Sequence, residues 1–203
     1  DYNNPLFACL ESDFEEENGS KFLNLYEMDL GLNCIVLKNR KKVSNDSYFM
    51  IPFKKGVFLF SQTQLEFLNL IENSNSNMII TSTIISVENM IFDYKQYIVT
   101  SSYSTKYDKK DLVIFHSENG KLYKINENTE KTEFFIEKFG EISPSLSFCI
   151  MKNGFLFSSS LSGFNEFYNI DYDMNLIQMN EKFENLNFIS DFHNKFKDSE
   201  EQV

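Results

Sequence analysis

The chain has 203 residues, of which 42% are hydrophobic and 16% aromatic, a composition that excludes global disorder and predicts a domain with a sizeable core. The formal net charge is −11, which disfavours a protein whose main task is to bind a phosphate backbone.

Short apolar or alternating segments separated by turn residues run along the chain, and no helical periodicity is sustained. This pattern predicts an all-β fold. Strands are predicted in the first half at 6–10, 22–28, 32–37, 48–52, 56–61, 64–71, 78–80 and 83–85. Strands are predicted in the second half at 97–103, 112–115, 121–125, 132–136, 146–151, 155–157, 166–170 and 176–179.

The clearest hairpin lies between Asp111 and Asn126. Leu112–Phe115 is apolar throughout, which is typical of a strand buried on both faces, and Lys121–Ile125 returns half polar. Between them, Asn119-Gly120 is the dipeptide that most readily supplies the two positive-φ residues of a tight turn.

This unit of apolar strand, turn and amphipathic strand occurs four times, roughly 40 to 55 residues apart. Its other copies begin at Leu6, Gly56 and Gly154. The spacing is that of β-propeller blades rather than of shorter solenoid repeats. The sequence therefore predicts a WD-repeat-like β-propeller.

Basic residues gather in two places. The run Lys38–Lys42 lies in a predicted polar loop at 38–47, and we interpret it as a solvated loop rather than a nucleic-acid site. A second group combines tyrosines that stack on bases with lysines, and we interpret it as an exposed turn: Tyr103, Lys106, Tyr107, Lys109 and Lys110. We therefore expect little direct nucleic-acid contact.

Metal and cofactor signals are weak. The cysteines, Cys9, Cys34 and Cys149, are odd in number, far apart and without a CxxC, so we expect neither a disulfide framework nor a zinc site, and a reducing compartment. The acidic turn Glu11–Gly19 lacks the alternating ligands and central glycine of a calcium loop, and we expect an exposed acidic loop. No metal or cofactor is predicted.

No catalytic set stands out, and we predict no catalytic, cofactor-binding or metal-binding residue. His116 and His193 have no metal-ligand spacing, and we expect His116 to be partly buried or near a turn. Ser158–Ser160 lacks the GxSxG elbow, so we expect these serines to cap strand-to-turn hydrogen bonds. The hairpin tips Ser117–Lys121 and Leu161–Asn165 are expected to be exposed loops that carry function.

The sequence has no signal peptide, no run of ~18 apolar residues and no initiator Met. We therefore expect no membrane association. The chain opens on Asp1-Tyr2-Asn3-Asn4-Pro5, and we expect it to be a piece of a longer polypeptide.

Two stretches, Asn4–Glu16 and Leu25–Asn33, closely resemble the NPxFACLExDYEE and YELDLGLN motifs of the family of splicing factor 3b subunit 3. Shorter segments are also similar to that family: Gly120–Ile125 to its GDIFKI, Cys149–Phe157 to its CVLKTGFLF, and Gly56–Ser61 in part to its GVLICS. The acidic turn after Glu17 looks shorter here, and the Asn-rich loop at 72–77 departs from the family pattern.

The resemblance implies that residues 1–196 are the later blades of an amino-terminal propeller, about four of a seven-bladed ring, followed by a polar tail at 197–203. It implies a nuclear, non-catalytic scaffold that acts in pre-mRNA splicing through protein–protein interactions. Its implied partners are the HEAT-repeat subunit and the smallest subunit of splicing factor 3b, within the small nuclear ribonucleoprotein that recognises the branch site.

Two alternatives remain open. The same superfamily includes damaged-DNA-binding protein 1 and the large subunit of cleavage and polyadenylation specificity factor, so the chain is alternatively an adaptor of a ubiquitin ligase or of a polyadenylation complex. A third hypothesis, from a different class, is a propeller enzyme whose funnel is lined with carboxylates; nothing in the sequence marks two carboxylates as facing each other.

Overall fold

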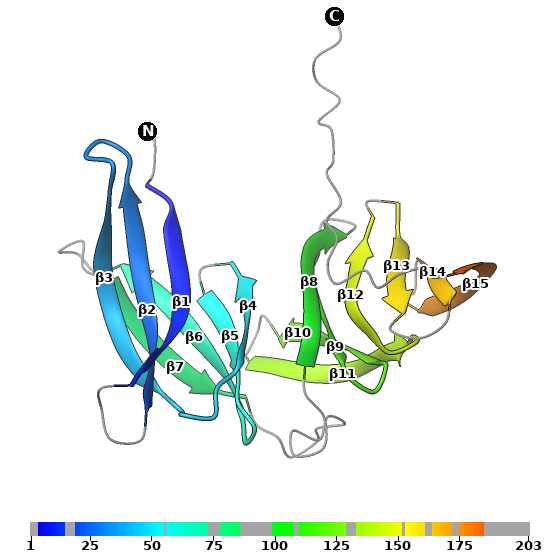
Figure 1. Cartoon of the computed structure of the whole chain (residues 1–203), viewed down its shortest axis with the longest axis horizontal. Helices are drawn as coiled ribbons and strands as arrows, with labels where there is room; N and C mark the ends of the chain where they lie inside the picture. Colours follow the sequence, from blue (N-terminus) through cyan, green and yellow to red (C-terminus); the bar gives the residue numbers. More distant parts are fainter. Residues whose placement is uncertain are drawn as a thin grey trace, which may run out of the picture. The chain divides into compact units, whose positions relative to one another are not determined.

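The computed structural model describes residues 4–14, 19–54, 56–72, 78–85, 99–107, 110–128, 133–151, 153–160, 164–171 and 175–184. Within them the chain forms antiparallel strands only, which confirms the all-β prediction (Figure 1). The strands of the first two sheets are β1 (Leu6–Asp13), β2 (Ser20–Asp29), β3 (Cys34–Val43), β4 (Phe49–Phe53), β5 (Gly56–Phe60), β6 (Leu65–Glu72) and β7 (Met78–Ile84). Those of the other two are β8 (Val99–Tyr107), β9 (Lys110–Ser117), β10 (Lys121–Asn128), β11 (Glu133–Glu141), β12 (Ser145–Ile150), β13 (Phe155–Ser160), β14 (Phe164–Ile170) and β15 (Leu176–Glu184).

The repeated sequence unit is the central hairpin of the three four-stranded sheets. The sheets have the orders β4-β5-β6-β7, β8-β9-β10-β11 and β12-β13-β14-β15, so the three later copies, β5–β6, β9–β10 and β13–β14, are second and third strands. The first copy is β1–β2, in a sheet of order β1-β2-β3. By this correspondence β1 takes the position of β5, β9 and β13, which are the second strands of the other sheets.

Spatial neighbours support that correspondence. The chain forms two compact units, Asp1–Asn89 and Met90–Val203. In the first, β3 lies beside β7, the last strand of the neighbouring sheet, and the Asn39 side-chain amide donates to the Met78 carbonyl at 2.6 Å. In the second, the first strands β8 and β12 lie side by side. Among the described residues, the β1–β2–β3 sheet therefore lacks a counterpart of the first strands β4, β8 and β12.

The core of the first unit lies between its two sheets. Leu23 and Val43 pack with Val57, Leu59 and Leu68, all buried. Every residue of β5 is buried, as expected for a strand that is apolar throughout. On the other face of β5, Phe58 lies 5.3 Å from the ring of Phe53 and 4.9 Å from that of Phe67, within the range of favourable aromatic pairs.

The core of the second unit joins its two sheets in the same way. Leu112 and Ile114 of β9 and Leu122 of β10 pack against residues of the other sheet, including Leu156 and Tyr168. The opposite face of β9 is also buried, where Phe115 stacks on Tyr123 with ring centroids 5.2 Å apart. All residues from Leu112 to Ser117 are buried, which confirms the prediction of a strand buried on both faces.

The Asn119-Gly120 turn differs from the prediction of two positive-φ residues. Only Gly120 has a positive φ, of 89°, and its N–H donates to the Ser117 carbonyl at 3.0 Å. The Ser117 hydroxyl also donates to the Lys121 carbonyl at 3.1 Å. This is the longer hairpin connection, a turn followed by one left-handed glycine, rather than a two-residue turn with both central residues at positive φ. Gly154, with φ of 84°, closes the β12–β13 hairpin in the same way through its bond to the Met151 carbonyl.

Candidate functional site

His116 lies at the end of β9, next to the turn as one of the two expectations had it, and it is completely buried rather than partly buried. Its Nδ1 lies 3.1 Å from the Thr100 hydroxyl, and its ring meets Phe148 edge-on at 6.2 Å. Burial lowers its pKa from 6.5 to about 4, so the ring is neutral at neutral pH. A general base must reach the proton that it removes, and this enclosed ring has no access to a solvent-borne substrate. His193 lies outside the described residues.

The serines of β13 are not arranged as nucleophiles. Ser158 and Ser159 are both 1% exposed, and neither hydroxyl has a hydrogen-bond partner among the described residues. An active nucleophile needs an adjacent base and an open path to substrate, and these two serines show neither feature. The expectation that Ser158 and Ser159 cap strand-to-turn hydrogen bonds is therefore wrong.

The acidic residues of β1 contact the neighbouring strands. Glu11 accepts hydrogen bonds of 2.7 Å from the Asn24 amide and from the Tyr26 hydroxyl. The hydrogen bond from the Tyr26 hydroxyl to the Glu11 carboxylate is the main reason why the pKa of Tyr26 is raised. In the described part of the chain, no group of three or more His, Cys, Asp and Glu side chains is placed to hold a metal ion.

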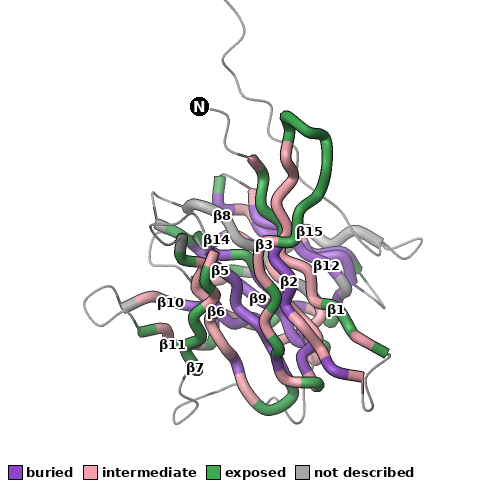
Figure 2. The backbone as a smooth tube through the Cα atoms, turned by 90° about the vertical axis from the view of Figure 1, so that its left-hand side faces the viewer, coloured by how far each residue is buried: buried purple, intermediate pink, exposed green. Residues whose placement is uncertain are grey.

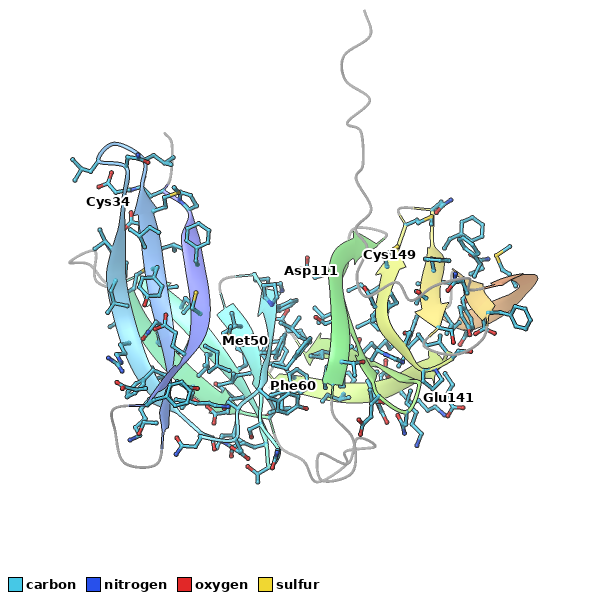
Figure 3. All side chains as sticks on the ribbon, viewed as in Figure 1. Cys34, Met50, Phe60, Asp111, Glu141 and Cys149 are labelled. Carbon is cyan, nitrogen blue, oxygen red and sulfur yellow. The ribbon has the colours of Figure 1, made fainter. Side chains whose placement is uncertain are left out.

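The three cysteines are free thiols in this structure. Cys9 is half-buried, Cys34 is exposed and Cys149 is buried. Figure 3 labels Cys34 and Cys149, which belong to different units. Burial is the main cause that raises the pKa of the Cys149 thiol, so this residue is a poor nucleophile.

The prediction of a loop at Lys38–Lys42 is wrong, because this run lies in the middle of β3. Lys38 forms an ion pair of 2.7 Å with Glu27, and Arg40 forms one of 3.0 Å with Asp13. The Arg40 guanidinium also lies 3.7 Å from the centroid of the Phe22 ring. Acidic and aromatic neighbours on β1 and β2 therefore engage two of the cations, Lys38 and Arg40, that would otherwise attract phosphate.

Replacing Arg40 by alanine is expected to lower the free energy of unfolding by about 1 kcal/mol, since it removes a cation–π contact and a surface ion pair. Lysine at this position keeps the charge but loses the planar stacking on Phe22, and we expect about half of that loss. Urea denaturation followed by far-UV circular dichroism measures both. Wild-type stability in the alanine variant would show that these contacts contribute nothing.

The described residues of the hairpin tips expected to be exposed are exposed only in part. In Ser117–Lys121 only Glu118 is exposed, while Ser117 and Gly120 are buried. In Leu161–Asn165 the first three residues lie outside the described residues, Phe164 is exposed and Asn165 is buried. The lysine and tyrosine side chains around Tyr103–Lys110 also lie outside the described part, and the backbone there continues β8 through Tyr107.

A different surface carries the exposed apolar side chains. The end of the β2–β3 hairpin, Asp29–Leu37, hereafter the β2–β3 tip, presents exposed Leu30, Leu32, Ile35, Val36 and Leu37. The tip projects past the ends of the neighbouring strands β4 to β7, and its side chains point outward around the labelled Cys34 (Figure 3). Sequence reasoning assigned a strand to 32–37 but missed its exposure. The signal was available in Leu30 and Leu32, which flank a turn glycine where polar residues are usual.

Comparison with known proteins identifies a family. The model of the RSE1/DDB1/CPSF1 first beta-propeller matches residues 1–193. Splicing factor 3B subunit 3 of Drosophila melanogaster is 27% identical over 191 residues, covering 83% of this chain and 15% of that protein. Pre-mRNA-splicing factor RSE1 of Candida albicans is 28% identical over 174 residues, covering 80% of this chain and 14% of that protein. The chain thus spans less than a sixth of the length of these relatives.

Proposed function

The chain belongs to the RSE1/DDB1/CPSF1 first β-propeller family, and from this premise we propose that it is a non-catalytic scaffold segment of the splicing factor 3b complex. The observation that carries the proposal is the match over 193 residues to a propeller family, joined to relatives named for pre-mRNA splicing. The parent protein acts in the nucleus, where it holds the HEAT-repeat and smallest subunits of the complex within the branch-site ribonucleoprotein.

Two physical features support a scaffold that binds proteins rather than RNA. The net charge of −11 opposes direct phosphate binding, and Lys38 and Arg40 of the basic run in β3 already contact acidic and aromatic neighbours. His116 and the serines of β13, the polar groups that most resemble catalytic residues, are buried. The segment therefore contributes surfaces to an assembly.

A second candidate is an adaptor of a ubiquitin ligase or a polyadenylation complex. It is favoured by the family itself, whose description also contains DDB1 and CPSF1. Both candidates predict that the parent turns over no substrate, whereas the hypothesis of a carboxylate-lined enzyme predicts an activity that substitutions of funnel carboxylates abolish.

Affinity purification of the tagged full-length parent from nuclear extract, followed by mass spectrometry and RNA sequencing, separates these candidates. We expect the HEAT-repeat subunit of splicing factor 3b and the branch-site small nuclear RNA to be recovered. Recovery of a cullin or of polyadenylation factors in their place would keep the fold and overturn the splicing assignment. An untagged extract provides the control for nonspecific recovery.

A further inference from the structure

The β2–β3 tip exposes more apolar surface than a soluble hairpin end requires. Leu32 is 76% exposed, Ile35 66% and Leu30 52%. Loop tips are ordinarily polar, and clustered exposed apolar side chains mark interaction sites. Figure 2 shows this end of the hairpin in the colour of exposed residues.

One face of the hairpin is apolar near the tip. The pairs Met28–Ile35 and Tyr26–Leu37 lie on this face, whereas Val36 stands opposite the charged Glu27 on the other. Ile35 and Leu37 are exposed, and Tyr26 and Met28 are half-buried. A partner that covers the tip can therefore extend its apolar contact from the turn leucines along this face.

Hydrogen bonds hold the turn in one shape. The Asp29 carboxylate oxygen Oδ1 accepts from the N–H groups of Gly31 and Leu32, each at 2.9 Å. The Leu30 N–H donates to Asn4 Oδ1 at 3.2 Å, and the Asn4 amide donates to Glu27 Oε1 at 2.7 Å. The two leucines are therefore presented on a preorganised turn, which reduces the ordering entropy that binding would cost.

The charges around the tip select the class of partner. The charged side chains between Glu27 and Lys38 are Glu27, Asp29 and Lys38, and Lys38 is paired with Glu27 at 2.7 Å. The tip is left with the negative charge of Asp29 beside its apolar surface. This combination repels nucleic-acid phosphates and anionic lipid headgroups, and it complements a basic group on a protein.

We propose that the β2–β3 tip is a docking knob that inserts Leu30 and Leu32 into an apolar pocket, rimmed by basic side chains, on a protein partner. The inference rests on the proposed function, because the partner is a subunit of the same splicing assembly. Apolar anchors that fill a pocket at the centre of an interface supply most of its binding energy.

The test uses the full-length parent in its complex, with a photo-crosslinking phenylalanine analogue in place of Leu32. The matched control carries the analogue at Ile84 on β7, which is 60% exposed in the same unit. We expect the Leu32 position alone to crosslink to a second protein, at a peptide with apolar residues and neighbouring Lys or Arg. The proposal would be overturned by a crosslink within the parent chain, by a crosslink to RNA or by the absence of any crosslink.

Substitution gives a second, independent measurement. Leu32→Asp is expected to weaken capture of the crosslinked partner by about tenfold or more, whereas Ile84→Asp leaves it unchanged. If both variants capture the partner equally and the wild type still recovers splicing proteins, the proposal that the tip docks on a partner is contradicted. The proposed function then remains supported. Failure of the wild type to recover splicing proteins would instead overturn the proposed function.

Discussion

Replacing Gly120 by alanine is expected to lower the free energy of unfolding by about 3 kcal/mol, because two penalties combine at this position. The residue has φ of 89°, which an L side chain rarely adopts, and an added Cβ would overlap the carbonyl oxygen of Ile142. That carbonyl belongs to the segment that joins β11 to β12, and the Ile142 N–H donates to the Gly120 carbonyl at 2.8 Å. Urea denaturation of the variant and the wild-type chain gives the difference.

Gly19 provides the matched control. It also has a positive φ, of 59°, but an added Cβ there meets no atom within 4 Å. Gly19→Ala therefore carries the backbone strain without the overlap, and we expect it to cost about 1 kcal/mol. Equal losses in the two variants would show that the close approach to Ile142 has no energetic consequence.

Acidification is expected to destabilise the chain through His116. In the unfolded chain this histidine binds a proton with its ordinary pKa of 6.5, whereas burial lowers the pKa to about 4 in the folded state. Between these values the unfolded state binds more protons, so the stability present above pH 6.5 is lost as the pH falls toward 4. The loss attributable to this group is about 3 kcal/mol.

A pH series on the wild type and His116→Gln isolates this effect. Glu27, Glu137 and Glu141 also have lowered pKa values, and their contribution to stability is lost on acidification in both proteins. The difference in unfolding free energy between wild type and variant is therefore expected to shift by about 3 kcal/mol between pH 7 and pH 4. A difference that stays constant across this range would contradict the buried neutral histidine.

The strands and their order were predictable where the apolar pattern was continuous. The run Leu112–Phe115 and the hairpin with Lys121–Ile125 occur as predicted, and the repeated unit marks the centre of the three four-stranded sheets. The matching family model confirms that these sheets belong to a β-propeller. The ring of seven blades and the boundary at residue 196 stay predictions.

Errors arose where neighbours in space decide the outcome. Lys38–Lys42 has the composition of a loop, and only the positions of Glu27, Asp13 and Phe22 on adjacent strands show why it pairs as a strand. Glycine at position 120 is typical of an exposed turn, yet the segment around Ile142 and Pro144 lies against Gly120. Contacts between residues that are distant in the chain cannot be read from a single sequence.

The strand part of the candidate surface was even less accessible to sequence reasoning than these contacts, although Leu30 and Leu32 at its turn gave a signal. Ile35, Val36 and Leu37 have the composition of a core strand, and their exposure follows from how far the hairpin extends beyond the strands that cover its lower part. The pattern of hydrophobic residues indicates which segments are suited to form a strand. Whether another element covers that strand depends on relative strand lengths, which this sequence does not encode locally.

Among the described residues no strand pairs with the outer edge of β1, and this edge determines what kind of segment can add to it. The Pro5 carbonyl accepts from the Met28 N–H, so the alternation along an antiparallel pair directs the amides of Ala8 and Leu10 away from β2. The side chains of these same two residues are partly buried and pack against the core. An incoming strand would pair with backbone groups of β1 whose positions are already fixed by that core. Its pairing would therefore depend on its extended backbone far more than on its own side chains.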